Sequence, residues 1–156
     1  MRVRLIAVGT RLPAWATSAC QEYLKRLAPQ LPVTLQEIAP GPRAAGGAAA
    51  RAVATEGQRL LAALRADAHV AALDERGQEF STRELAAWLK QRMHAGTDLS
   101  FVIGGPDGLA AAVRERADTT LSLSRLTLPH ALARVLLAEQ LYRAVSLLHN
   151  HPYHRE

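Results

Sequence analysis

The sequence is short of cysteine, of aromatic residues and of long apolar runs. Its single cysteine, Cys20, cannot form a disulfide within the chain, which excludes a disulfide-stapled fold. The first ten residues, MRVRLIAVGT, form too short an apolar run for a signal peptide, and Arg4 interrupts that run. No segment approaches the roughly 20 apolar residues that a membrane span needs. These absences predict a protein of the cytoplasm with no membrane partner, in which Cys20 is a buried free thiol.

Aliphatic residues and basic charge are what the sequence has in excess. Of its 156 residues, 49% are hydrophobic but only 4% are aromatic, so the core must consist mainly of Leu, Val, Ile and Ala. This length predicts a single globular domain over residues 1–156. Lys and Arg number 19 against 14 acidic residues, and the net charge of +5 favours a polyanionic partner such as nucleic acid.

Strand and helix patterns alternate along the chain. One helix has a clear start, because Ser81 and Glu84 form a capping-box pair, and a clear end at Gly96. The glycine- and proline-rich start of APGPRAAGGAAARAV predicts a loop after Ile38, and ERGQ predicts a turn after Asp74. The alternation indicates an α/β fold with a mainly parallel sheet and helices on both faces. The expected extended segments are 3–9, 32–38, 69–74, 98–105 and 119–131, and the expected helices are 13–28, one ending near residue 64, 82–95, 109–117 and 131–150.

The final helix, ALARVLLAEQLYRAVSLLHN, is apolar on most of its surface. Such a helix either lies centrally in the fold or packs against another subunit. Its apolar surface is wider than one side of a monomer's sheet should cover, and we therefore expect a homodimer.

Ligands of parallel sheets bind beyond the carboxyl ends of the strands, which directs attention to the segments after Leu73, Ile103 and Leu123. The segment GGPDGL follows Ile103, and its first glycine, Gly104, would let the backbone approach a ligand; the alternative is a turn that merely starts a helix. The segment SRLTLPHA follows Leu123. Its leucines should be covered and offer an apolar wall to a small ligand, or they simply pack in the core. Neither a dinucleotide fingerprint nor a P-loop is present.

The chain ends in HNHPYHRE, which concentrates three of its six histidines, His149, His151 and His154, in eight residues. This segment is a solvated tail, a metal site or part of a functional site. A zinc site is disfavoured, because the segment has no cysteine and no carboxylate cluster. We therefore expect no metal.

At this point the motifs show a resemblance to a known family. AVGT near the start, LDERGQEFSTRELA, FVIGGPDGL, LSLSRLTLPHALARVLLAEQLYRA and the terminal NHPYHRE resemble the large-subunit ribosomal RNA methyltransferase H family of the SPOUT class. The resemblance covers essentially the whole chain. It implies a trefoil knot in the C-terminal half, a homodimer, and S-adenosylmethionine-dependent methylation of N3 of a pseudouridine in the 23S rRNA of the ribosome. Asp107 departs from the glutamate that is common in the family.

The resemblance also assigns site residues. By motif, the cofactor pocket comprises Leu73, Gly104, Leu123, Ser124, Arg125, Leu126, Thr127 and Leu128. From the chemistry of their side chains, we place the terminal residues Tyr153, His154 and Arg155 on the substrate side of the pocket with His130 near them, and we leave His149 and His151 as structural or RNA-facing. A histidine can accept the N3 proton, with a water or hydroxide as the alternative base; an arginine can stabilise an imidate oxygen or hold a phosphate, and a tyrosine can stack on a base. Two alternatives stay open, namely a SPOUT methyltransferase of another RNA and a non-enzymatic RNA-binding adaptor of the same fold.

Overall fold

The computed structural model describes residues 1–43 and 49–155. A sheet of five parallel strands runs through these residues in the spatial order β2-β1-β4-β3-β5. The strands are β1 (Val3–Val8), β2 (Val33–Ile38), β3 (His69–Glu79), β4 (Leu99–Ile103) and β5 (Thr119–Ser122). The α/β class and the parallel sheet that the sequence predicts are therefore confirmed. The knot stays a prediction.

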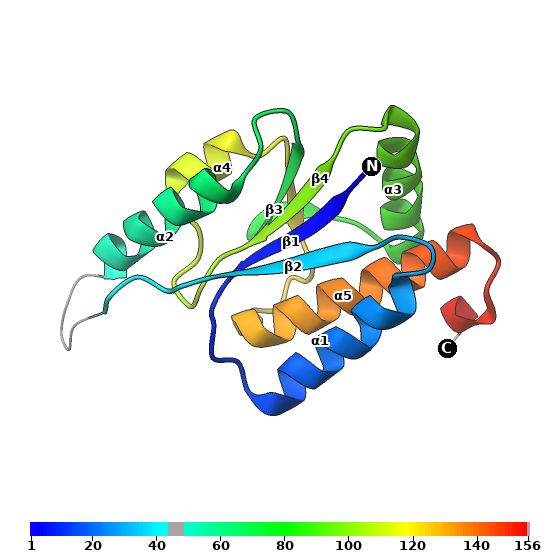
Figure 1. Ribbon diagram of the computed structural model, residues 1–156, viewed down its shortest axis with the longest axis horizontal. Coiled ribbons are helices and arrows are strands. Elements are labelled where there is room, and N and C mark those ends of the chain that lie inside the picture. The colour runs from blue at the N-terminus through cyan, green and yellow to red at the C-terminus, as the bar shows by residue number, and fades with distance from the viewer. Residues whose placement is uncertain (44–48, 156) are drawn as a thin grey trace.

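Helices cover both faces of this sheet, as expected (Figure 1). On one face lie α1 (Ala14–Leu27), α3 (Thr82–Ala95) and α5 (His130–Leu148). On the other lie α2 (Ala49–Ala63) and α4 (Ala111–Arg116). A short 3-10 helix, η1 (Pro152–Arg155), follows α5 at the end of the chain. In the described ranges no helix combines the length and the apolar character that crossing a membrane requires.

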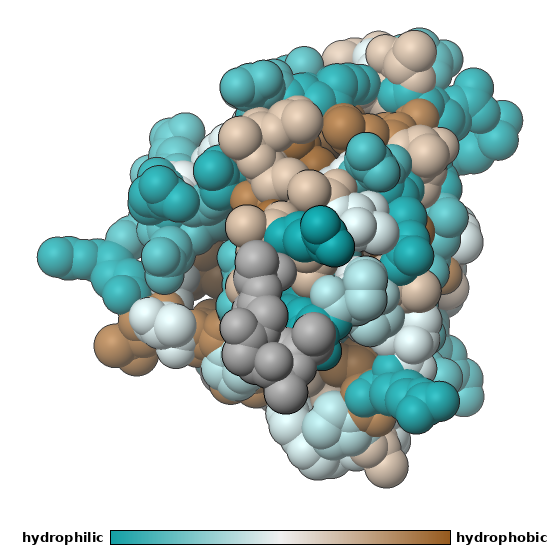
Figure 2. Space-filling model, turned by 90° about the vertical axis from the view of Figure 1, so that its left-hand side faces the viewer, coloured by the Kyte–Doolittle hydropathy of each residue, from teal (hydrophilic) through white to brown (hydrophobic). Residues whose placement is uncertain are grey.

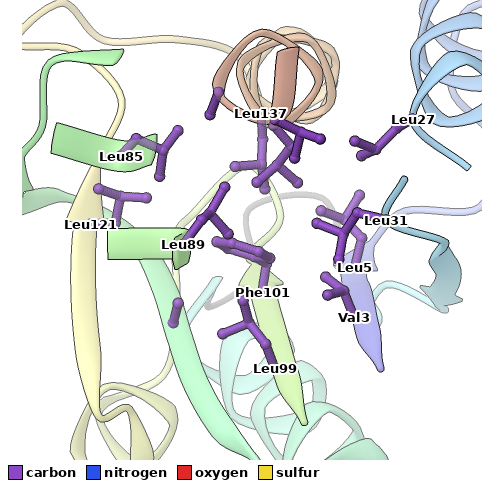
Figure 3. Packing of buried hydrophobic residues seen from close by; sticks show 14 of the residues in the cluster. Val3, Leu5, Leu27, Leu31, Leu85, Leu89, Leu99, Phe101, Leu121 and Leu137 are labelled. Atoms are coloured by element: carbon purple, nitrogen blue, oxygen red, sulfur yellow. The ribbon is translucent and has the colours of Figure 1, made fainter. Parts of the chain in front are cut away.

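Each sheet face buries its own set of aliphatic side chains, because successive residues of a strand point to opposite sides. In β1, Leu5 joins the cluster under α1, α3 and α5, whereas Ile6 joins the cluster under α2 and α4. Phe101 of β4 lies in the middle of the first cluster, beside Leu89 of α3 and below Leu137 of α5 (Figure 3). Burial on both faces explains why the central strands are almost continuously apolar.

Helix α5 lies between α1 and α3, and this central place accounts for much of its apolar surface. The local signals for the start and end of α3 are confirmed as well. Ser81 and Glu84 form the complete capping box of α3, and Gly96 ends that helix with a φ of 71°. Cys20 is buried and unpaired, and burial raises the pKa of its thiol.

Two predicted boundaries are wrong. The expected turn at residues 75–78 belongs to β3, which continues to Glu79 with a register shift between Leu73 and Gln78. A Cβ on Gly77 would lie 2.7 Å from the backbone of Thr120, so glycine allows β3 to approach β5 closely just before their pairing resumes at Gln78. The fifth strand, in turn, covers only residues 119–122 of the expected 119–131. Part of the expected loop after Ile38, residues 44–48, lies outside the described residues.

Candidate functional site

A cavity of about 680 Å³ lies beyond the carboxyl ends of three neighbouring strands. Its walls come from residues 73–76 within β3, from the segments after β4 and β5, from Arg114, and from the first turn of α5. In Figure 1 these segments meet at the left-hand side of the molecule, where α5 begins. Figure 2 views the molecule from that side and shows a hollow between a projecting group of side chains and the main body. The cavity is therefore at the edge of the sheet that the strand-end argument indicates.

The residues expected to hold a cofactor gather around this cavity with one exception. Arg125 is not part of the lining; it is exposed and lies 4.0 Å from Glu79. The lining includes the other expected residues, Leu73, Gly104, Leu123, Ser124, Leu126, Thr127 and Leu128. The expected substrate residue His130 lines the cavity too.

The segment after β4 folds into a tight glycine turn over residues 104–108. The N–H of Gly108 donates to the carbonyl oxygen of Gly105 at 3.1 Å, and Gly108 has a φ of 82°, which favours glycine. A Cβ on Gly104 would lie 2.8 Å from the backbone of Gly108. Glycine at position 104 is thus needed for the turn to close on itself. This is a different reason from the expected one, which was room for a ligand against that position.

The loop after β5 is irregular but ordered by its serines. The hydroxyl of Ser122 donates to the carbonyl oxygen of Ser124 at 3.0 Å, and the N–H of Leu126 donates to the hydroxyl of Ser124 at 2.9 Å. The expectation that the leucines of this loop are covered is wrong for Leu126, which is 75% exposed. An exposed leucine on the rim of a cavity offers apolar surface to whatever binds there.

Charged groups missed by the sequence reasoning also line the cavity. The carboxylate of Asp74 is largely buried and lies 3.6 Å from Arg76 and 3.7 Å from Arg114. Asp74 directly follows the predicted ligand-facing Leu73, so its place in the sequence was a usable signal. Arg114 comes from α4, and nothing in its local sequence indicates a site.

His130 stands at the first residue of α5, where the helix meets the cavity. Burial lowers the pKa of its imidazole, and the positive charge of Arg134 lowers it further. Gly9, at the carboxyl end of β1, faces this ring: a Cβ on Gly9 would lie 3.6 Å from the His130 Nε2. The wall of the cavity thus includes an imidazole whose lowered pKa favours its neutral form, which can accept a hydrogen bond.

The terminal residues do not lie at this cavity within the chain. None of Tyr153, His154 and Arg155 lines it, and Figure 1 shows the C-terminus at the opposite end of α5. Helix α5 has 19 residues and is therefore about 28 Å long. One chain thus keeps the expected substrate residues of the tail far from the expected cofactor residues.

The tail is nevertheless held in place. Tyr153 donates from its hydroxyl to Glu139 at 3.1 Å, its ring centroid lies 4.5 Å from that of Tyr142, and the guanidinium carbon of Arg143 lies 4.8 Å from its ring centre. Burial raises the pKa of the Tyr153 hydroxyl, as do Tyr23 and Glu139 beside it. Tyr153 thus anchors the tail to α5. A solvated, frayed terminus is excluded for this residue.

Two histidines of the tail, His149 and His151, make local contacts. The Nδ1 of His149 lies 2.9 Å from the carbonyl oxygen of Val145 one turn earlier, and the Nδ1 of His151 accepts from the N–H of Tyr153 at 3.2 Å. Over the ranges that the structure covers, no three His, Cys, Asp or Glu side chains are grouped closely enough to hold a metal ion.

Fold and cavity together define a class. An α/β protein with a parallel sheet, and with a large cavity built from a glycine turn and an apolar loop at the strand ends, has the architecture in which such sheets bind small organic ligands. The family model described as "Predicted SPOUT methyltransferase" matches residues 1–154. The chain belongs to the SPOUT methyltransferase family.

Sequence relatives agree with this assignment. The chain is 53% identical over its whole length to a protein of Thioalkalivibrio sulfidiphilus and 49% identical over 99% of its length to one of Methylococcus capsulatus; the alignments cover both relatives completely. Both relatives are named ribosomal RNA large subunit methyltransferase H.

Solved structures support the fold alone. A probable methyltransferase from Bordetella pertussis Tohama I matches with a TM-score of 0.60 and 21% identity, over 92% of this chain and 94% of that one. A probable methylase family protein from Haemophilus influenzae Rd KW20 matches with a TM-score of 0.58 and 15% identity, over 96% of this chain and 69% of that one.

Proposed function

We propose that this protein is a single-domain enzyme that transfers a methyl group from S-adenosylmethionine to N3 of a pseudouridine in the 23S rRNA of the ribosome, and hence acts in the cytoplasm. The observation that carries the proposal is the cavity at the strand ends, because seven of the eight residues that the family resemblance assigns to the cofactor line it. The names of the full-length relatives support an rRNA of the large subunit as the substrate. The net charge of +5 fits a polyanionic partner.

The residues around the cavity fit S-adenosylmethionine. Its adenosine and methionine parts need apolar walls together with backbone polar groups. The leucines at positions 73, 123, 126 and 128 would supply the walls, and the glycine turn and Ser124 would supply the polar groups. When bound, this cofactor supplies an activated methyl group on a sulfonium centre.

The protein's own task is to present the nitrogen. N3 of pseudouridine carries a proton at neutral pH and is a poor nucleophile, so the enzyme must align it and either remove the proton or stabilise the anion that forms. His154 is the proposed proton acceptor, and Arg155 is proposed to stabilise the imidate oxygen or hold a phosphate. His130 is proposed to contact the base from the cavity wall, where its neutral imidazole can accept a hydrogen bond.

If the tail takes part in methyl transfer, its separation from the cavity implies a site shared between two copies of the chain. Tyr153 is anchored to α5 at Glu139, nine residues and about 14 Å along the helix from His130, and a tail held there can contribute to methyl transfer only at the cavity of a partner. A homodimer with antiparallel α5 helices meets this requirement. Leu132, Val135 and Leu136 lie one helical turn apart or less on α5 and are only half-buried, which leaves apolar surface for such an interface.

Three measurements test the proposal. Calorimetry should detect binding of S-adenosylmethionine, which an RNA-binding adaptor would not need. Mass spectrometry of rRNA nucleosides from a strain lacking the gene should show loss of N3-methylpseudouridine, and adding the purified protein to ribosomes from that strain should restore it. Methylation of tRNA instead of ribosomes would contradict the substrate assignment.

Light scattering at micromolar concentration should show a dimer; a monomer would contradict the shared site.

A further inference from the structure

A carboxylate is buried beside the cavity, on the face of the sheet opposite α5. Glu56 of α2 is only 2% exposed. It accepts hydrogen bonds from the backbone N–H of Gly41 at 2.9 Å and from the guanidinium of Arg43 at 2.7 and 3.2 Å. Buried ion pairs add little to stability compared with apolar side chains of the same size. Stability alone therefore does not account for a charge in this place.

Arg43 connects this carboxylate to the wall of the cavity. Its Nε donates to the carboxylate of Asp107 at 2.9 Å, while its Nη1 and Nη2 are directed to Glu56. Asp107 belongs to the glycine turn and lines the cavity. The hydrogen bonds to Glu56 and Asp107 raise the pKa of Arg43, so the bridge carries its charge at every physiological pH.

Three glycines bring the backbone segments around Glu56 into contact. A Cβ on Gly41 would lie 2.4 Å from the carbonyl oxygen of Ala52, and a Cβ on Gly57 would lie 2.6 Å from the Cβ of Ala110. A Cβ on Gly105 would lie 3.3 Å from the Glu56 carboxylate itself. The loop before α2, α2 and the glycine turn are therefore packed against one another around a single charged group.

We propose that Arg43 and Glu56 are positioning residues for the methyl-donor cavity, which they serve by fixing the glycine turn through Asp107. Arg43 then holds two parts of the protein together and does not contact an RNA phosphate, although it is a basic residue on a loop of an RNA-modifying protein. The inference rests on the proposed function, since it takes S-adenosylmethionine to be the ligand of the cavity. Its physical basis is that Nε, Nη1 and Nη2 of Arg43 all donate hydrogen bonds to acceptors within the protein.

The test compares variants of the full-length protein for cofactor affinity and for RNA binding. Arg43→Gln should raise the dissociation constant for S-adenosylmethionine on the order of tenfold, the effect of losing one charge-assisted hydrogen bond. Asp107→Asn, at an exposed side chain that cannot disrupt the core, should weaken binding in the same direction. Arg43→Lys should restore part of the affinity. The matched control is Arg51→Gln, which removes the same charge from an exposed position on α2 and should leave cofactor affinity unchanged.

The salt dependence of ribosome binding shows whether Arg43 has this positioning role or contacts an RNA phosphate. Losing one phosphate contact lowers the slope of log affinity against log salt by about one unit. Arg43→Gln should leave this slope at the parental value. Parental cofactor affinity in Arg43→Gln and Asp107→Asn, or a slope reduced by about one unit in Arg43→Gln, would overturn the inference. A parent protein that binds no S-adenosylmethionine would instead be a failure of the proposed function.

Discussion

The guanidinium of Arg134 on α5 donates to the carboxylate of Glu37 on β2 at 2.6 Å. Arg134 is among the most buried large side chains of the molecule, at 2% exposure, and it also donates to the carbonyl oxygen of Gly9 at 3.2 Å. This contact ties the first turns of α5 to the carboxyl ends of β1 and β2. His130 lies on the same turns, and the loop that lines the cavity leads directly into them. The ion pair of Arg134 and Glu37 therefore fixes one wall of the cavity.

Glu37→Ala should destabilise the protein by about 2 kcal/mol, because it leaves the buried guanidinium of Arg134 without its charged partner. Urea unfolding monitored by circular dichroism measures the change. Glu37→Gln keeps an acceptor and should lose less. An unfolding free energy of Glu37→Ala within about 0.5 kcal/mol of the parent, the range typical of exposed substitutions, would show that the ion pair does not hold α5.

Helices cover both faces of the sheet, and the hydrophobic pattern of the buried strands therefore differs sharply from that of the helices. This difference made the fold largely predictable. The misses have physical causes. Residues 75–78 are polar and contain a glycine, which locally favours a turn, yet they belong to β3, which contacts β5 closely at Gly77 and pairs with it again from Gln78. Leu126 looks like a core residue but lies on the rim of a cavity. Both outcomes depend on contacts between segments far apart in the sequence.

Two substitutions separate the closure of the glycine turn from contact with the ligand. Gly104→Ala should lower both stability and affinity for S-adenosylmethionine, because the added Cβ meets the backbone of Gly108; overpacking of this kind costs about 1–3 kcal/mol. Leu126→Ala should leave stability within about 0.5 kcal/mol of the parent and still weaken cofactor binding. Calorimetry and thermal unfolding of both variants supply the comparison. Unchanged affinity in Leu126→Ala would remove Leu126 from the binding wall.

His69 is expected to make stability depend on pH. Its Nδ1 lies 3.1 Å from Nη1 of Arg92, which can only donate, so Nδ1 must be unprotonated; Nε2–H then donates to the hydroxyl of Thr119 at 2.9 Å. Burial lowers the pKa of this imidazole below its ordinary value of 6.5, and the charge of Arg92 adds to the effect. The folded state therefore binds the proton less well than the unfolded state does.

The sign follows from linkage: the stabilisation is complete above about pH 6.5 and is lost as the pH falls through the lowered folded-state pKa. The free energy of unfolding of the parent should thus decrease between about pH 6.5 and pH 5. His69→Gln keeps an acceptor for Arg92 without a titrating ring and should flatten this decrease. His94→Gln, at an exposed position on the same helix as Arg92, is the control. A parental pH profile in His69→Gln would contradict the assignment.

The candidate site was predictable in parts. Parallel strands end at one edge, so the segments after Leu73, Ile103 and Leu123 had to meet there. The tail was different. Its residue types indicated proton transfer and RNA contact, but the length of the helix before it already separated it from the cavity. The anchoring of Tyr153 by Glu139, Tyr142 and Arg143 had no sequence signal, because it joins side chains 10 to 14 positions apart through a turn.

A mixture of two inactive variants decides whether the tail works on the partner's cavity. One variant lacks residues 153–156, the last of which lies outside the described residues; it should bind S-adenosylmethionine like the parent but not transfer the methyl group. The other, Thr127→Trp, fills the cavity from an exposed position and keeps the tail. In a mixed dimer one site then combines an intact cavity with an intact tail, and the other site has neither.

Equal mixing followed by exchange of subunits gives mixed dimers in about half of the molecules, so methylation of ribosomes should recover to about a quarter of the parental rate. A tail that serves its own cavity predicts no recovery, because each chain then keeps its own defect. Single-turnover methylation, measured before and after subunit exchange, distinguishes the two. Parental activity of the truncated protein alone would end the assignment of Tyr153, His154 and Arg155 to catalysis, and would leave η1 as a packing element of α5.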